Sequence, residues 1–362
     1  MTPHRPTTSI HIAVLDTDVP VPNVYAARGL YSSQFRVLLQ AAAARLNARR
    51  SGAKLDIRTT AYDVVGGCLP PLERLRRGPR AEDGDGDGDR DRPIDALLIT
   101  GSSAAAYALD RYPWIAPLQG FIQTVYDGYP AVRIFGSCFG HQIVAQALLS
   151  RQNPRFAGSS SSSSSSSCSI SGGGGYVSVA ACPQGYEIGI EPITLDPAFT
   201  VSFPELRTRL ARPDGKLRLQ LIHGDRVMPL SLSSQDDPSS ASPGLPLPWL
   251  NVGSTAKSPI QGLYRPSRVL TLQGHFEFDA FVARETCREF ARRGGWSDAD
   301  VAAALERIGS SRGSGDDDAK VVAEMVVLFV AGEDGGVRLV PGSGSGSGSG
   351  SNGVKDVKDG SS

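Results

Sequence analysis

The sequence predicts a three-layer α/β sandwich, in which helices cover both faces of a mainly parallel sheet and antiparallel strands extend its edge. Two observations lead to this fold class. In the first half of the chain, short runs rich in Ile, Val and Leu alternate with helix-like stretches, as in a parallel sheet buried between helices. In the second half, strand-like runs follow one another with short connections. The parallel part is therefore Rossmann-like or flavodoxin-like, with right-handed crossovers.

Four apolar runs in the first half, each closed by polar or glycine residues, have the composition of buried strands. They are 9–15, 55–62, 94–100 and 131–136. Between them, residues 31–50 carry apolar side chains such as Phe35 and Leu39 with a helical period, and the pattern ends before Gly52. Residues 114–126 repeat this character. The stretch "HQIVAQALL", which follows the fourth run, is also expected to be an amphipathic helix.

The second half is expected to add antiparallel edge strands and then to return to helices. The strand-like runs are 187–195, 217–225, 226–232, 249–255, 261–266 and 268–274. The helices are 278–293, 297–308 and 318–331. Because their apolar residues again fall on one face, these three helices are expected to pack back over the sheet.

One domain is expected from 9 to 332, interrupted by low-complexity insertions. Runs of Gly, Ser, Asp and Pro cannot bury a core, and patterned segments resume on both sides of each insertion. The insertions are 76–93, 156–175, 233–248 and 309–317. A Gly/Ser-rich tail at 341–362 is expected to be disordered.

The composition excludes several classes of partner. The 362 residues include 37 basic and 37 acidic ones, so no net field favours nucleic acid or an anionic membrane surface. No apolar run has the length of about 18 residues that a membrane span needs, and the N-terminal residues lack the apolar core of a secretory signal. Five cysteines at irregular spacing argue against a disulfide framework. A cytoplasmic protein of the cytosol is expected.

A cysteine stands at a sharp corner in "IFGSCFGHQIVAQAL" (134–148), between an expected strand and an expected helix. Gly136 and Gly140 flank Cys138 at two residues on either side, which is the small-residue pattern of a nucleophile elbow. The helix N-terminus favours a thiolate there, and the N–H of Phe139 faces an oxyanion formed at the sulfur. The alternative is a buried, inert thiol. A core position, however, needs no such bend.

A second oxyanion donor is expected from Gly101 and Ser102, which follow the strand 94–100. In a doubly wound sheet, ligands bind at the carboxyl ends of the strands, so these backbone N–H groups and Cys138 belong to one edge. A simple glycine turn remains the alternative.

A thiol nucleophile needs a base, and the candidates are His4, His11, His141, His223 and His275. His275 ends a strand, and Glu277 stands two residues later, where a carboxylate can orient the imidazole. The alternative for Glu277 is an ordinary acid at a helix start. His141, in the first helical turn after the cysteine, is expected to pack or to bond locally, and the role of His223 stays open.

Two motifs resemble those of a known family. "GSCFGHQ" (136–142) resembles the nucleophile motif of class I glutamine amidotransferases, and "QGHFEF" (273–278) resembles their Gly-His-Pro-Glu motif. The segments "LDTDVPVP", "GYEIGIEPITL", "LIHGDRV" and "GSTAKSPIQGLY" are similar to the stand-alone amidotransferase-like proteins of fungi and plants, which include the γ-glutamyl peptidases. The resemblance runs from about residue 10 to about residue 331, without the insertions.

The resemblance implies a thiol hydrolase that acts on free glutamine or on a γ-glutamyl peptide through a glutamyl thioester. Cys138 would be the nucleophile, His275 the base, and Glu277 the group that fixes its tautomer. The residues implied for the oxyanion and the substrate are Gly101, Ser102, Phe139 and Gln142. No metal or organic cofactor is implied. The chain has no P-loop or synthetase pattern, so an enzyme that accepts ammonia would be a separate, unknown partner.

The sequence departs from the family at Phe276, where proline is usual, and at Ser102, where glycine is frequent. A non-catalytic binding or regulatory member of the same fold, with a weakened site, is therefore the alternative function. A redox-sensing cysteine would need neither His275 nor Glu277. The His-Gly-Asp turn at 223–225 is expected to be structural or to line the pocket, and no role is assigned to Cys68, Cys168, Cys182 and Cys287.

Overall fold

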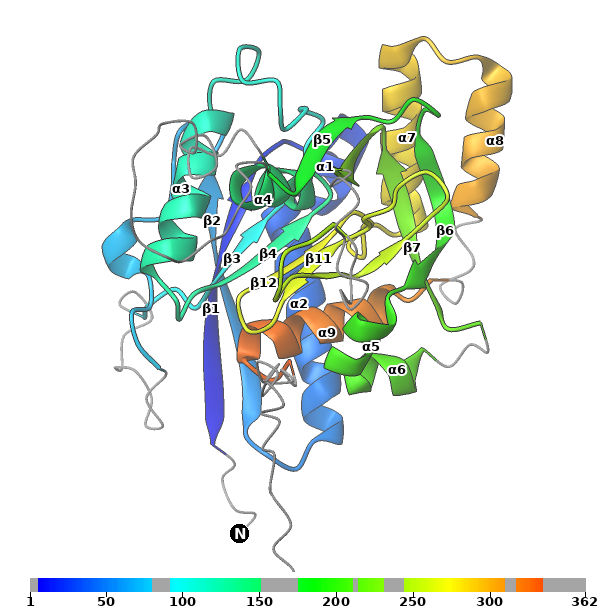
Figure 1. Ribbon diagram of the computed structural model, residues 1–362. Helices are drawn as coiled ribbons and strands as arrows, with labels where there is room; N and C mark the ends of the chain where they lie inside the picture. The colour runs from blue at the N-terminus through cyan, green and yellow to red at the C-terminus, as the bar shows by residue number, and fades with distance from the viewer. Residues whose placement is uncertain are drawn as a thin grey trace, which may run out of the picture.

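The fold class is confirmed by a computed structural model, in which a seven-stranded sheet lies between helices and smaller sheets (Figure 1). The structure describes residues 6–79, 92–150, 175–210, 214–230, 244–309 and 317–334. Most of the expected insertions (76–93, 156–175, 233–248 and 309–317) and the whole tail 341–362 lie outside these residues, as do His4 and Cys168.

The central sheet contains the four strands expected in the first half. They are β1 (Thr7–Asp16), β2 (Lys54–Asp63), β3 (Ala96–Ile99) and β4 (Arg133–Ser137). The spatial order is β2-β1-β3-β4-β12-β11-β9, and it is parallel from β2 to β12. The remaining members are β12 (Val269–Leu272), β11 (Leu263–Arg265) and β9 (Leu250–Asn251), of which β11 and β9 form an antiparallel edge.

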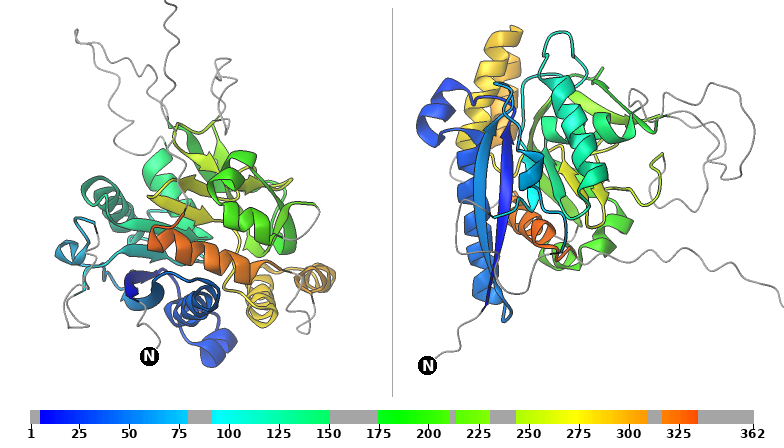
Figure 2. Two further views of the ribbon diagram at one scale, coloured as in Figure 1. Left: turned by 90° about the horizontal axis from the view of Figure 1, so that it is seen from below. Right: turned by 90° about the vertical axis from the view of Figure 1, so that its left-hand side faces the viewer.

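Helices cover both faces of this sheet (Figure 2). Successive strand residues point to opposite faces, so Leu98 joins one core cluster and Leu97 the other. The first cluster includes α2 (Tyr31–Arg49) and α9 (Ala319–Ala331), and the second includes α3 (Ile115–Gly128) and α4 (Phe139–Leu149). Apolar runs without alternation, as at 94–100, follow from burial on both faces.

Helix α4 is buried on every side, whereas its sequence suggested an amphipathic helix. All of its residues, including His141, Gln142 and Gln146, are buried. A helix can bury polar side chains only when these find partners, and His141 Nδ1 lies 2.8 Å from the hydroxyl of Thr271. Burial lowers the pKa of His141 to about 3, so its imidazole is neutral at physiological pH. The expectation that His141 packs in this helix agrees with its burial, but its hydrogen bond is not local, because Thr271 belongs to β12.

The second-half strands divide among three sheets. Only β11 and β9 extend the central sheet as antiparallel edge strands, and β12 pairs in parallel with β4. The others form two small antiparallel sheets. One consists of β6 (Glu187–Leu195), β7 (Lys216–His223) and β10 (Gly253–Ser254), and the other of β5 (Val177–Ala181) and β8 (Asp225–Pro229). The single strand expected at 249–255 is thus two strands, β9 and β10, which join different sheets.

Three further helices follow the sheets, as the sequence predicts. They are α7 (Ala280–Gly294), α8 (Asp298–Ile308) and α9. Only α9 packs over the central sheet, beside α2; α7 packs against β7 and against α1 (Pro22–Arg28), and α8 packs against β6. The short helices α5 (Pro197–Ser202) and α6 (Pro204–Arg209) and the 3-10 turn η1 (Leu72–Arg74) complete the described elements. Among the described helices, none combines the length and the apolar character needed to span a bilayer.

The corner between β4 and α4 is packed backbone against backbone. A Cβ atom on Gly136 would lie 2.4 Å from the carbonyl oxygen of Gly140, and one on Gly140 would lie 2.3 Å from the carbonyl oxygen of Ile99. Real Cβ atoms do not approach oxygen so closely. Both glycines are therefore required for α4 to leave β4 directly beside β3.

A substitution at this corner should destabilise the whole fold. Gly140→Ala should lower the free energy of unfolding by about 1–3 kcal/mol, because β3 must move to admit the methyl group. The matched control is Gly120→Ala on the exposed side of α3, where nothing lies within 4 Å; this change should raise stability by about 0.5–1 kcal/mol. Urea denaturation of both variants measures the difference. Equal stability of the two variants would contradict the close packing.

Candidate active site

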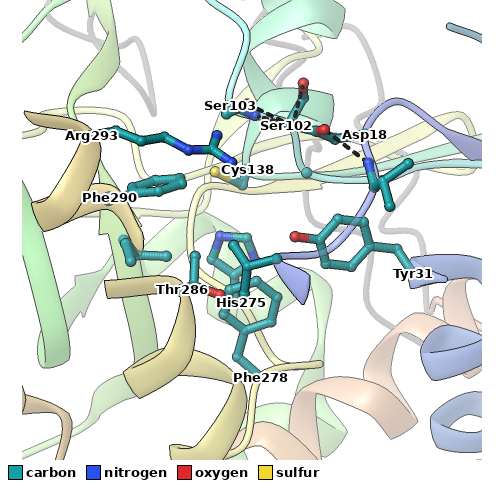
Figure 3. Close-up of a pocket in the computed structure, with 14 residues that line it drawn as sticks. Asp18, Tyr31, Ser102, Ser103, Cys138, His275, Phe278, Thr286, Phe290 and Arg293 are labelled. Atoms are coloured by element: carbon teal, nitrogen blue, oxygen red, sulfur yellow. Dashed lines mark hydrogen bonds between the residues drawn. The ribbon is translucent and has the colours of Figure 1, made fainter. Parts of the chain in front are cut away.

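The ends of four parallel strands build one cleft at the carboxyl edge of the sheet. Asp18 follows β1, Gly101 follows β3, Cys138 follows β4, and His275 follows β12. All four residues line the same cavity (Figure 3). This edge is where ligands bind in open parallel sheets, so the sheet topology explains how residues far apart in the sequence meet.

Cys138 occupies the corner in a strained conformation. Its φ of 51° and ψ of −104° are unusual for a residue with a side chain, and only Ser267 shares a positive φ among the described non-glycine residues. Its backbone N–H donates to the carbonyl oxygen of Leu272 (2.8 Å), which ties the corner to β12. The side chain is 6% exposed, and it lines two cavities rather than a closed core.

A continuous series of contacts leads from Cys138 to a carboxylate. The imidazole of His275 lies beside the sulfur of Cys138, whose charge and hydrogen bonding contribute to the raised pKa of the ring, and its Nδ1 lies 2.7 Å from Glu277 Oε1. Ser137, the residue before the cysteine, donates its hydroxyl to the same carboxylate (3.2 Å). The backbone N–H of His275 donates to Gln220 in β7 (2.8 Å). The two motifs that resemble the amidotransferase family, 136–142 and 273–278, therefore meet in one series of contacts.

The charges in this series control the protonation of His275. Burial alone lowers the pKa of the imidazole, but the charges of Glu277 and Cys138 and hydrogen bonds to both outweigh burial and raise the pKa to about 10. At neutral pH the imidazole is therefore protonated, with the sulfur on one side and the carboxylate on the other.

Phe276 stands at the usual proline position and is fixed by packing. It is buried in edge contacts with Phe35 from α2 and Phe135 from β4, each with ring centroids 5.6 Å apart. On the neighbouring residue, the His275 ring stacks on Phe278 with centroids 3.9 Å apart and an interplanar angle of 13°. The orientation of the imidazole is thus held by aromatic contacts on both sides of the motif.

The expected oxyanion loop lies beside the cysteine. A Cβ atom on Gly101 would be 3.6 Å from that of Cys138 and 3.1 Å from His275 Cε1, so the glycine allows close approach of the loop. Asp18 holds the loop, because its Oδ2 accepts the backbone N–H of Ser103 (2.8 Å) and lies 3.4 Å from the Ser102 hydroxyl. Phe139 is the first residue of α4, where a backbone N–H has no partner within the helix.

Gln142 lies in the cleft wall, with its amide bound to the protein itself. Its Nε2 is 3.1 Å from the backbone oxygen of Asp225 and 3.1 Å from Oε1 of Gln273. Gln273 in turn donates to the sulfur of Cys138 (3.5 Å). Gln142 is therefore connected to the cysteine through a second glutamine.

His223, whose role the sequence left open, belongs to a buried polar network next to the cleft. Its Nδ1 lies 2.8 Å from the backbone oxygen of Asp225, and its Nε2 lies 3.0 Å from Oε2 of Glu187. Glu187 also accepts hydrogen bonds from Thr255 (2.6 Å) and Gln261 (2.9 Å). Burial raises the pKa of Glu187, but the hydrogen bonds with His223, Thr255 and Gln261, together with the charge of His223, outweigh burial and hold the pKa below its ordinary value. The network unites three of the sequence segments that the family resemblance singled out.

The cleft has two branches that meet at Cys138. Both are lined by Ser102, Ser103, Cys138, Ile222 and Phe290. The first branch continues to Asp18 and Tyr31 on one side and to Thr286 and Arg293 of α7 on the other (Figure 3). The second branch continues to Tyr186, His223, Gly224 and Asp225.

Several of these residues were missed by the sequence interpretation. Asp18 lies in the segment "LDTDVPVP", and Ser137 and Gln273 lie inside the two motifs. The family resemblance therefore marked the segments of these residues, but it did not indicate which contacts their side chains make. Thr286, Phe290 and Arg293 share one face of α7 at helical spacing, and nothing in the sequence set this face apart. Within the described ranges, no cluster of three or more residues could hold a metal ion.

Removing the charge of Glu277 should lower the pKa of His275. In the native protein this pKa is raised above 6.5, so the stabilising effect of the imidazolium is fully present below about pH 6.5 and is lost as the pH rises toward about 10. Glu277→Gln should lower the midpoint by at least about one pH unit, as followed by NMR of the imidazole Cε1–H. Glu285→Gln on α7 is the control and should leave the midpoint unchanged. An unaltered midpoint in Glu277→Gln would disprove the electrostatic assignment.

Comparison with known proteins gives relatives of one kind. No protein-family model matches the chain. A Schizosaccharomyces pombe protein with the provisional name of a glutamine amidotransferase-like protein is 27% identical over 272 residues, which cover 75% of this chain and 81% of the relative. A Saccharomyces cerevisiae protein, provisionally named a glutamine amidotransferase, is 28% identical over 52% of this chain and 55% of its own length.

Solved structures of similar shape are also described as glutamine amidotransferases. The one from Thermotoga maritima is 15% identical and covers 89% of this chain and 96% of its own, with a TM-score of 0.49. The one from Methylobacillus flagellatus is 14% identical and covers 90% and 94%, with a TM-score of 0.44. At these scores the structural likeness carries no weight beside the two sequence relatives. Those relatives confirm the resemblance that the motifs indicated: the chain is similar to the class I glutamine amidotransferase-like proteins.

Proposed function

We propose that the protein hydrolyses γ-glutamyl amides through a glutamyl thioester on Cys138. The observation that carries this proposal is the continuous series of contacts from the Cys138 sulfur through His275 to Glu277, at the point where the two branches of the cleft meet. A charged imidazole beside a sulfur on a nucleophile elbow has the chemistry needed for attack on a carbonyl. A buried thiol without function would need none of these contacts.

In the first half of the reaction, the thiolate attacks the γ-carbonyl carbon and forms the C–S bond, while the carbonyl electron pair moves to oxygen. The N–H groups of Phe139 and of the Gly101–Ser102 loop receive this oxyanion. When the pair returns, the C–N bond breaks, and the His275 imidazolium gives its proton to the leaving nitrogen. The products are a free amine, or ammonia, and the thioester. Glu277 keeps the imidazole oriented throughout.

In the second half, a water molecule attacks the thioester, and the neutral His275 takes a proton from it. A second tetrahedral oxyanion forms and collapses, the C–S bond breaks, and the electron pair returns to sulfur. Glutamate leaves, and the thiolate–imidazolium pair is restored. No oxidant, metal or organic cofactor enters either half of this reaction.

The first branch of the cleft suits a glutamyl side chain. Its free space is about 60 Å³, and because one water-sized group needs roughly 10–15 Å³, this branch accepts about five non-hydrogen atoms. That is the size of a glutamyl side chain with its amide group. At the mouth, Asp18 and Arg293 offer opposite charges to the α-ammonium and α-carboxylate groups of such a substrate.

The second branch favours a leaving group larger than ammonia. It adds about 90 Å³ of space on another side of Cys138, lined by Tyr186, Gly224 and Asp225. Ammonia needs no such room, whereas the amino acid or peptide released from a γ-glutamyl peptide does. Asp225 also contributes a carboxylate to this branch, which would attract the positive charge of a newly formed amine. A γ-glutamyl peptide is therefore the preferred substrate of this proposal over free glutamine.

The proposal is tested by intact-mass detection of a glutamyl adduct. Incubation with glutamine and, separately, with glutathione should give an adduct on Cys138 and release ammonia or an amine, respectively. Cys138→Ala should abolish both the adduct and the release of product. Cys68→Ala is the control, because Cys68 is an exposed thiol outside the cleft, and it should behave like the native protein. Absence of adduct and of turnover with either compound would refute the hydrolase and favour a non-catalytic binding protein.

Recognition of the α-carboxylate by Arg293 predicts a change in KM. Arg293 Nε bonds Glu289 (2.9 Å), but Glu289 is already held by two hydrogen bonds from Arg292, so the Arg293 guanidinium can turn to a ligand at small cost. Arg293→Ala should raise KM roughly 10- to 100-fold, with a smaller change in kcat. The neighbouring Arg292→Ala is the matched control. Equal kinetics of the two variants would exclude Arg293 from recognition.

A further inference from the structure

We propose that Gln273 is a further catalytic residue, which donates a hydrogen bond from its side-chain amide to the sulfur of Cys138 and thereby favours the thiolate. The inference rests on the proposed role of Cys138 as the nucleophile. Gln273 Nε2 lies 3.5 Å from the sulfur, and both side chains are buried. A donor at this distance stabilises the charged form of the sulfur more than the neutral form.

The orientation of the Gln273 amide follows from its neighbours. The backbone oxygen of Asp225 can only accept a hydrogen bond, so the side-chain atom of Gln142 that lies 3.1 Å from it is the nitrogen. The same nitrogen is 3.1 Å from the Gln273 side chain, which must present its oxygen there. The Gln273 nitrogen is then left facing the sulfur. The backbone carbonyl of Asp225 therefore fixes the orientation of the Gln142 amide, which in turn fixes that of the Gln273 amide.

The backbone of Gln273 is held as firmly as its side chain. Its N–H donates to the carbonyl oxygen of Gln261 (2.8 Å), whose own side chain binds the carboxylate of Glu187. The next residue, Gly274, lies so close to β7 that a Cβ atom there would be 2.9 Å from Leu221 Cδ2. The tripeptide from Gln273 to His275 therefore brings two hydrogen-bonding side chains to one sulfur.

The two donors differ in their chemistry. His275 gives up its proton during the first half of the reaction and regains one in the second, whereas the amide of Gln273 never loses its proton. It therefore remains a donor when the thiolate leaves the second tetrahedral intermediate. Gln142 acts through Gln273 in this arrangement, as a positioning residue, which differs from the direct contact with substrate that the family resemblance implied.

Other titratable or charged groups face the sulfur or its cleft from every side. They are Asp18 and Tyr31 from the loop and helix after β1, Tyr186 before β6, His223 and Asp225 from the small sheets, His275 and Glu277 after β12, and Arg293 on α7. The neutral substitution Gln273→Leu leaves all of these charges in place and adds none. A change in the titration of the sulfur would therefore report the lost donor.

The test is the rate of alkylation of Cys138 by iodoacetamide as a function of pH, in the full chain. Gln273→Leu removes the donor, and Gln273→Glu keeps the shape and the contact with Gln142 but replaces the donor by a carboxylate oxygen. The pH of half-maximal rate should rise by about one unit in Gln273→Leu and by more in Gln273→Glu. Gln142→Leu, which frees the amide to turn, should give a smaller rise in the same direction.

The control is Gln146→Leu, one turn further along α4, because Gln146 is buried on the same helix and lines neither branch of the cleft. Its alkylation profile should match that of the native protein. Native-like profiles in both Gln273 variants, with circular dichroism and melting temperature retained, would overturn the inference. Because the assay uses no glutamyl compound, its result stands apart from the hydrolysis test: a shifted profile without turnover would refute only the proposed hydrolase.

Discussion

The structure depends on one steric constraint, the contact of backbone with backbone where β4 turns into α4. Gly136 has no space for a side-chain atom because the carbonyl oxygen of Gly140 fills that position, and the carbonyl oxygen of Ile99 does the same at Gly140. This contact forces the residue between them into a positive φ and holds its sulfur outside the sheet. The same turn makes Cys138 the N-cap residue of α4, so position, strain and a favourable local field have one cause. Every later feature of the cleft is arranged around a point that this contact fixes.

The rest of the site is added by segments that come much later in the chain. His275 is joined to β7 through Gln220, and the buried network of Glu187, His223, Thr255 and Gln261 supports the wall beside it. The small sheets therefore form part of the cleft wall. Loosening them would weaken the placement of the imidazole beside the sulfur, which the contacts of Phe276 with Phe135 and of Glu277 with Ser137 in β4 also support.

The sequence was informative where a structure depends on nearby residues. The strands β1 to β4, the corner at Cys138 and the pairing of His275 with Glu277 all follow from short patterns. It was uninformative about which strands pair when they lie far apart in the sequence. Short apolar strands have similar sequences whether they join the central sheet, as β12 does, or a separate sheet, as β7 does. The burial of α4 on every side also depends on neighbours that its own pattern does not contain. The sequence of α7 did not indicate which of its faces lines the cleft, because this depends on how the helix packs in the fold.

Phe276 shows how a departure from a family pattern can preserve geometry by another route. Proline restricts its own backbone locally, whereas Phe276 is held by rings of α2 and β4, and the imidazole beside it is held by Phe278. The first kind of restraint exists in any conformation of the chain, and the second exists only when the core between α2 and the sheet is packed. The orientation of His275 is therefore coupled to the folding of the whole domain. A weakened core would disturb the site before it unfolded the sheet, so activity and core packing are expected to fail together.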